Sequence, residues 1–293
     1  GRKTKPCHQT KRDQIMTAAV SYASGPSHKA LLGMPIGTLF DDIVARHGGR
    51  EAVVSVHQGI RLSYQDLAQR VNTLARAFIA SGFSKGDRVG IWSPNNVEWL
   101  VTQYATAKAG IILVTINPAY RLHELAFVLE QSGCKGLVLQ NRFKTSDYEA
   151  LICELCPQLQ SCEPGQLRSE KFANLTTVIS MTESTLPGIT NWQDFLELAG
   201  QSTAAELAQR QAEQDFDDAI NIQYTSGTTG FPKGATLSHH NILNNGFFVA
   251  GIMNFGVEDR LIVPVPLYHC FGMVMGKDRK STRLNSSHTV ISY

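Results

Sequence analysis

The sequence predicts an α/β fold of layered, mostly parallel sheets covered by helices. Three observations lead to this prediction. Strand-like apolar runs alternate with helical patterns from residue 88 to residue 179. Hydrophobic residues make up 43% of the 293-residue chain, which is enough for a sizeable core. Two polar segments rich in glycine or proline follow directly on apolar runs, where ligand-binding segments lie at the carboxyl ends of parallel strands.

The region before residue 88 is predicted to form two helices and two strands. A short amphipathic helix spans residues 38–46, and strands span residues 52–56 and 60–62. A longer helix begins at Ser63, because Ser63 and Asp66 have the spacing of a capping box. Its apolar face recurs at helical intervals, at Leu67, Val71, Leu74 and Phe78.

The remaining elements follow from the alternation of strands and helices. Strands are predicted at residues 88–92, 111–116, 136–139, 175–179, 219–224, 235–237 and 260–265. Helices are predicted at residues 96–109, 122–131, 146–155 and 204–214, and from His239 or Asn241 to about Met253. Residues 158–174 lack apolar periodicity and are predicted to be a loop. This rhythm is typical of a parallel sheet with helices on both faces.

Composition excludes several classes of function. The net charge is only +2 and no long basic stripe is present, so a nucleic acid is not an expected partner. The most apolar stretch, residues 100–116, is interrupted by polar residues and glycine, so no transmembrane segment is predicted. The six cysteines include one close pair, Cys153 and Cys156, but a zinc site needs a second pair. We therefore expect free thiols and no metal-ligating residues.

The most informative segment runs from Tyr224 to Asn241 and reads YTSGTTGFPKGATLSHHN. Its glycines let the backbone approach a ligand closely, and its amides and hydroxyls form a donor surface for anions. Lys233 adds a positive charge suited to phosphate oxygens. The segment is not a Walker A loop, because Lys233 is preceded by proline and followed by Gly234 and Ala235.

This segment resembles the phosphate-binding signature of the acyl-adenylate-forming (AMP-binding) enzymes. Two further segments support the resemblance: PVPLYHCFG at residues 264–272, which borders the acyl and adenylate pocket in that family, and NPAYRLHEL at residues 117–125. Over residues 38–276 the chain is most similar to mitochondrial medium-chain acyl-CoA ligases. The resemblance implies the fold of their N-terminal domain, and a fatty acid, ATP, Mg²⁺ and coenzyme A as substrates and cofactors.

By this resemblance, ten consecutive residues line the nucleotide phosphates: Thr225, Ser226, Gly227, Thr228, Thr229, Gly230, Phe231, Pro232, Lys233 and Gly234. The enzymes of this family join a carboxylate to the α-phosphate of ATP and then pass the acyl group to the thiol of coenzyme A. Lys233 and His269 are the predicted catalytic residues. Because a lone histidine is more often structural, a structural role for His269 stays open.

Several neighbouring residues are assigned structural roles. Tyr268 and Phe271 are expected to be apolar walls of the pocket. His239 and His240 are expected to cap a helix and to face the surface, since no third metal ligand is evident. The segment that follows the strand at residues 88–92 is expected to contain core and turn positions, at Trp92, Pro94, Asn95 and Trp99.

The two ends are predicted to lie outside the family domain. Residues 1–30 are expected to be a basic, disordered arm, either a remnant of a mitochondrial presequence or a simple tail. Residues 31–276 are predicted to be a partial AMP-binding domain. Residues 277–293 lack helical or strand periodicity and are expected to be a disordered tail foreign to the family.

The expected function is that of a medium-chain acyl-CoA ligase, but this chain is expected to be inactive alone. It lacks the family's Tyr-Gly-x-Thr-Glu segment, the later aspartate that holds the ribose, and the lysine of the C-terminal domain that stabilises the adenylation transition state. The alternatives are a long-chain or aryl-acid ligase, a non-catalytic nucleotide-binding or interaction fragment, and an incomplete translation product. The resemblance implies a mitochondrial location, with a cytoplasmic one as the alternative, and leaves the oligomeric state open.

Overall fold

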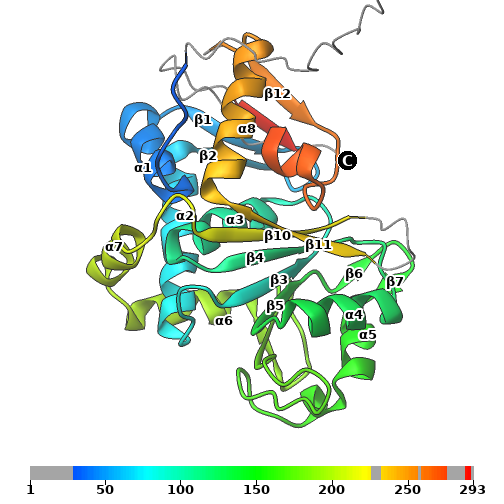
Figure 1. The fold of residues 1–293 in the computed structure, drawn as a ribbon. Coiled ribbons are helices and arrows are strands. Elements are labelled where there is room, and N and C mark those ends of the chain that lie inside the picture. The colour runs from blue at the N-terminus through cyan, green and yellow to red at the C-terminus, as the bar shows by residue number, and fades with distance from the viewer. Residues whose placement is uncertain (1–28, 226–231, 257–258, 276–287, 292–293) are drawn as a thin grey trace, which may run out of the picture. The chain divides into compact units, whose positions relative to one another are not determined.

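The computed structural model describes residues 29–225, 232–256, 259–275 and 288–291 (Figure 1). The chain divides into two units, Gly1–Leu31 and Leu32–Tyr293, and every described helix and strand lies in the second unit. Its elements form a seven-stranded sheet, a four-stranded sheet and covering helices, so the predicted α/β fold is confirmed.

The seven-stranded sheet has the strand order β11-β10-β4-β3-β5-β8-β9. Every neighbouring pair is parallel except β10 and β11, which form an antiparallel hairpin at one edge. The strands are β3 (Arg88–Trp92), β4 (Ile112–Ile116), β5 (Gly136–Leu139), β8 (Thr177–Ser180), β9 (Ile189–Asn191), β10 (Ala219–Thr225) and β11 (Lys233–Ser238).

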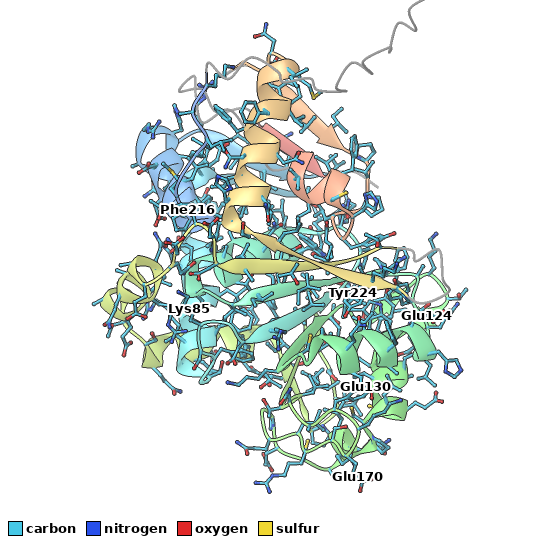
Figure 2. All side chains as sticks on the ribbon, viewed as in Figure 1. Lys85, Glu124, Glu130, Glu170, Phe216 and Tyr224 are labelled. Carbon is cyan, nitrogen blue, oxygen red and sulfur yellow. The ribbon has the colours of Figure 1, made fainter. Side chains whose placement is uncertain are left out.

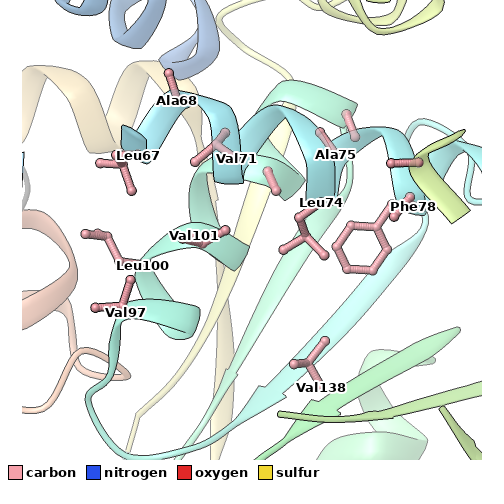
Figure 3. Packing of buried hydrophobic residues seen from close by; sticks show 14 of the residues in the cluster. Leu67, Ala68, Val71, Leu74, Ala75, Phe78, Val97, Leu100, Val101 and Val138 are labelled. Atoms are coloured by element: carbon pink, nitrogen blue, oxygen red, sulfur yellow. The ribbon is translucent and has the colours of Figure 1, made fainter. Parts of the chain in front are cut away.

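Both faces of this sheet are covered, because successive strand residues point to opposite sides. Val138 of β5 packs in one core cluster with α2 (Tyr64–Ala80) and α3 (Val97–Ala109). Figure 3 shows Leu67, Val71, Leu74 and Phe78 of α2 packing over α3 and above Val138. The neighbours of Val138 in β5 pack on the other face with α4 (Leu122–Ser132) and α5 (Tyr148–Leu155).

The four-stranded sheet has the order β12-β13-β1-β2, with β12 (Arg260–Val263), β13 (His288–Ile291), β1 (Glu51–Ser55) and β2 (Ile60–Ser63). A third core cluster joins α1 (Ile36–His47), α8 (His239–Ile252) and β12 to apolar residues of the large sheet. The remaining helices are α6 (Trp192–Glu197) and α7 (Ala204–Ala212), and β6 (Arg142–Phe143) and β7 (Ser146–Asp147) are two-residue strands. Two short 3₁₀ helices, η1 (Pro157–Gln160) and η2 (Leu198–Gln201), and a short π-helix, η3 (Phe271–Met275), complete the described elements.

The helix boundaries follow the local signals in the sequence. Ser63 and Asp66 form the predicted capping box, in which each side chain accepts a hydrogen bond from the other residue's backbone N–H. Asn96 caps α3 by accepting the N–H of Trp99 at 2.7 Å. Gly110 ends α3 in a left-handed conformation, with φ of 70°, which glycine adopts without strain.

The structure differs from the predicted elements in several short stretches, including the unpredicted strand β6 and the 3₁₀ helix η1 at the start of the predicted loop. Strand β9 and helix α6 were not predicted, because both are too short to show a period. Residues 146 and 147 form β7 rather than the start of a helix, which begins after the cap Asp147. Residues 288–291 form β13, although the sequence shows no strand period there, because they pair in parallel with both β1 and β12.

Candidate functional site at the carboxyl edge of the large sheet

Three chain segments leave the large sheet at the same edge. In the parallel register, Gln223 of β10 lies opposite Thr115 of β4, and Ile116 of β4 lies opposite Trp92 of β3. Three segments therefore start from neighbouring strand ends. They begin after Trp92 of β3, after Ile116 of β4 and after Thr225 of β10. Ligands of open α/β sheets bind beyond this carboxyl edge.

The ends of the predicted phosphate loop are held by the β10–β11 hairpin. Thr225 lies opposite Lys233, and the Thr225 hydroxyl donates a 3.5 Å hydrogen bond to the Lys233 carbonyl. The side chains of Thr225 and Lys233 are exposed, and Pro232, which directly precedes Lys233, is half-buried. The loop's central residues lie outside the described residues, so their predicted role stays a prediction: Ser226, Gly227, Thr228, Thr229, Gly230 and Phe231.

Gly234 has a structural reason for lacking a side chain. A Cβ at this position would lie 3.1 Å from Cγ2 of Ile222 and 3.2 Å from Cζ of Tyr224. Tyr224 itself is buried in the core cluster that contains the α4 residues, and Figure 2 labels it near the helix that carries Glu124 and Glu130. A side chain here would have to displace Ile222 or Tyr224 by a few tenths of an ångström. The predicted contact of Gly234 with phosphate stays a prediction.

Two buried amide side chains hold the segment that follows β12. The Leu267 N–H donates to Asn95 Oδ1 at 2.7 Å, and Asn95 Nδ2 donates to the Val265 carbonyl at 2.9 Å. Gln223 Nε2 donates to the Tyr268 carbonyl at 3.2 Å. Asn95 therefore does more than the turn position that the sequence predicts for it. Its place three residues after the end of strand β3 was the available signal of a larger role.

A cavity of about 310 Å³ opens between these segments. Tyr268, which is half-buried, is one of its walls as predicted. Phe271 is 51% exposed and is not among the lining residues, so it does not form a wall of this cavity. The lining combines the ends of β3 and β4 with the segment after β12 and the β6 strand: Pro94, Asn95, Asn117, Pro118, Ala119, Phe143, Pro264, Pro266 and Tyr268.

His269 lies at the exposed end of the same segment. Its N–H donates to the Pro266 carbonyl at 3.2 Å, and its carbonyl accepts the Met273 N–H at 2.9 Å. Its Nδ1 accepts the Phe271 N–H at 3.3 Å, so the neutral ring carries its proton on Nε2. His269 can thus present an Nε2–H donor to a ligand, and its predicted catalytic role stays a prediction.

The prediction that His239 faces the surface is wrong. His239 is fully buried, and its Nδ1 accepts the Ile36 N–H at 3.1 Å. Burial lowers the pKa of its ring to about 4. Ser238, not His239, caps α8, and among the described residues no three His, Cys, Asp or Glu side chains are placed to hold a metal ion. The packing of α8 against the start of α1 explains the burial.

Comparison with known proteins identifies the family. The AMP-binding enzyme family matches residues 40–276. The chain belongs to this family. The segment at residues 264–272 follows β12 of the four-stranded sheet, and hydrogen bonds from Asn95 and Gln223 hold it beside the carboxyl edge of the large sheet.

The relatives include the mitochondrial medium-chain acyl-CoA ligase ACSF2 of Mus musculus, which is 43% identical over 262 residues. The alignment covers 88% of this chain and 42% of the mouse protein, so the chain spans less than half the length of this relative. No helix in the described part of the chain is long and apolar enough to cross a membrane.

Solved structures agree on the fold. The N-terminal domain of FACL13 from Mycobacterium tuberculosis superimposes with a TM-score of 0.66 at 24% identity, covering 89% of this chain and 57% of that one. ATP-bound MatB from Rhodopseudomonas palustris gives a TM-score of 0.63 at 25% identity, covering 89% and 45%. The layered sheets of this chain are therefore those of the N-terminal domain of acyl-CoA ligases.

Proposed function

We propose that this chain is the phosphate-binding part of an AMP-forming acyl-CoA ligase that activates medium-chain fatty acids. One observation carries the proposal: three segments typical of the family start from adjacent strand ends or meet around one cavity. The ligase chemistry and chain length come from the relatives, which are named as medium-chain acyl-CoA ligases. A mitochondrial location has the same support.

The proposed chemistry needs positive charge near the triphosphate. A carboxylate anion attacks the α-phosphorus of ATP, the bond to pyrophosphate breaks, and an acyl-adenylate forms. The thiol of coenzyme A then displaces AMP. Both steps depend on positioning and on offsetting negative charge. Lys233, which is exposed at the mouth of the loop, would contribute this charge, and the Thr225 hydroxyl would donate a hydrogen bond.

The described residues fit ATP better than they fit a separate metal ion. Lys233 and Thr225 are donors suited to phosphate oxygens. The carboxylates and histidines among the described residues form no cluster that could hold a cation. In this proposal Mg²⁺ arrives with ATP, held mainly by the phosphates and by water.

A binding experiment tests the proposal directly. ATP titrated into the chain in a calorimeter should bind, and Lys233→Met should weaken the binding about tenfold, because one charge-assisted hydrogen bond is lost. Lys171→Met is the matched control, since Lys171 is an exposed lysine over the ring of Phe172, outside the loop. Equal affinity in the wild type and Lys233→Met would count against the assigned phosphate site.

Turnover is tested separately. We expect this chain alone to catalyse no ATP–pyrophosphate exchange with octanoate, palmitate or benzoate. Exchange with octanoate would show that the chain is itself a ligase, and a preference for palmitate or benzoate would replace the proposed substrate. We expect the chain to bind ATP without catalysing exchange. A non-catalytic nucleotide-binding fragment would give the same result.

A further inference from the structure

We propose that Asn95 is a positioning residue, which sets the site segment Val265–Tyr268 at the wall of the cavity and so controls the affinity for an acyl-adenylate. This inference rests on the proposed function. It goes beyond that function because Asn95 lies outside all three segments typical of the family, and the site segment begins 170 positions after it in the sequence.

The geometry of Asn95 is that of a two-point clamp. Its side-chain amide imitates a backbone peptide: Oδ1 accepts the Leu267 N–H at 2.7 Å, and Nδ2 donates to the Val265 carbonyl at 2.9 Å. Asn95 is only 6% exposed, so water competes little for these groups. Two hydrogen bonds to residues two apart fix both the position and the direction of the chain.

The site segment needs such a clamp because of its own sequence. Pro264 and Pro266 have no N–H and cannot donate to a neighbouring strand. Gln223 supplies a third hydrogen bond, to the Tyr268 carbonyl. The side-chain amides of Asn95, beyond the end of β3, and of Gln223, within β10, thus bond the backbone after β12 ends at Val263.

The position of the clamp links it to the cavity. Asn95 and Tyr268 both line it, and Pro264 and Pro266 alternate along the same wall. If the site segment moves away from Asn95, this wall of the cavity moves with it, and so does His269, which directly follows the segment. The two ends of the predicted phosphate loop, Thr225 and Lys233, pair instead within the β10–β11 hairpin. Loss of the clamp should therefore weaken the binding of an acyl-adenylate more than the binding of ATP.

The chain contains a matched control for this test. Asn244, which is 7% exposed, accepts the Leu32 N–H at 2.8 Å and donates to the Leu32 carbonyl at 3.1 Å. It holds a different segment through two hydrogen bonds to one residue, and its Nδ2 also donates to the His240 carbonyl at 3.0 Å. Asn95→Leu and Asn244→Leu each remove these hydrogen bonds and replace the amide with a similarly branched apolar side chain, so both should lower the melting temperature to a similar extent.

Two measurements separate positioning from general stability. Hydrogen exchange followed by mass spectrometry reports opening of the peptide at residues 264–272. Calorimetry reports affinity for ATP and for a non-hydrolysable octanoyl-adenylate analogue. We expect Asn95→Leu to speed hydrogen exchange in this peptide about tenfold. The same variant should lower the affinity for the analogue about tenfold and leave the affinity for ATP within about twofold of wild type. Asn244→Leu should change neither the exchange of this peptide nor the affinity for the analogue.

Two results would overturn the inference: wild-type exchange and analogue affinity in Asn95→Leu, or the same losses in Asn244→Leu. If Asn95→Leu does not fold, Gln223→Leu removes the bond to the Tyr268 carbonyl, together with a 3.7 Å contact to Met273 Sδ, and should give smaller changes in the same direction; no change would again refute the inference. If the wild type binds neither nucleotide, the proposed function fails, and the exchange comparison still decides whether Asn95 holds the segment.

Discussion

Acid should destabilise this protein through His239 well before its carboxylates titrate. The ring is fully buried, its Nδ1 accepts the Ile36 N–H, and its Nε2 has no hydrogen-bond partner among the described residues. A proton on Nδ1 would break the bond to Ile36 and place a charge in the interior. Burial therefore lowers the pKa of His239 from 6.5 to about 4.

The sign and size of the effect follow from proton linkage. Below pH 6.5 the unfolded chain binds a proton at this histidine while the folded chain does not, so stability falls as the pH falls and levels off below about pH 4. With these two pKa values, the loss between pH 7 and pH 5 is about 2 kcal/mol, and the full loss is about 3 kcal/mol. Asp218 and Asp215 oppose the shift and Lys85 adds to it.

The assay is urea unfolding of the wild type and of His239→Asn between pH 7.5 and pH 5. Asparagine keeps an acceptor near the Nδ1 position but cannot take up the proton. The free energy of unfolding should fall about 2 kcal/mol further in the wild type than in the variant. His57, whose pKa burial also lowers, is present in both proteins and cancels in the difference. His240→Asn, at the half-buried neighbour of His239, is the control and should keep the wild-type pH dependence. Parallel curves for the wild type and His239→Asn would refute the reasoning.

Three further predictions concern packing, capping and thiol reactivity. Leu74→Ala should lower the free energy of unfolding by about 2–5 kcal/mol in urea titrations, because Leu74 is fully buried between α2 and the sheet; a loss below about 1 kcal/mol would contradict this packing. Ser63→Ala should lower the free energy of unfolding by about 1 kcal/mol, because it removes the N-terminal cap of α2. Thr73→Ala, within the same helix, leaves this cap in place. In the folded protein, iodoacetamide should modify the exposed Cys270 before Cys134, which is buried and whose pKa burial raises to about 11. Peptide mapping by mass spectrometry would show the order, and early labelling of Cys134 would contradict its burial.

Much of the fold could be predicted because its signals are local. The strand at residues 88–92 and the strand at residues 136–139 have the predicted boundaries, since each is a short apolar run between polar turns. The capping box at Ser63 depends only on residues three apart. Strands β9 and β13 were not predictable in this way, because pairing with neighbouring strands, rather than their own periodicity, makes them strands.

The sequence by itself determined the family and the predicted phosphate loop, because a dense run of glycines, hydroxyl residues and one lysine has few other physical uses. Only the tertiary structure decided that Asn95 holds the segment of Val265 and Leu267, and that His239 is buried under the start of α1. Both depend on contacts between residues more than 160 positions apart. Such contacts arise from how strands and helices stack. No local sequence pattern around Asn95 or His239 predicts its hydrogen-bond partner.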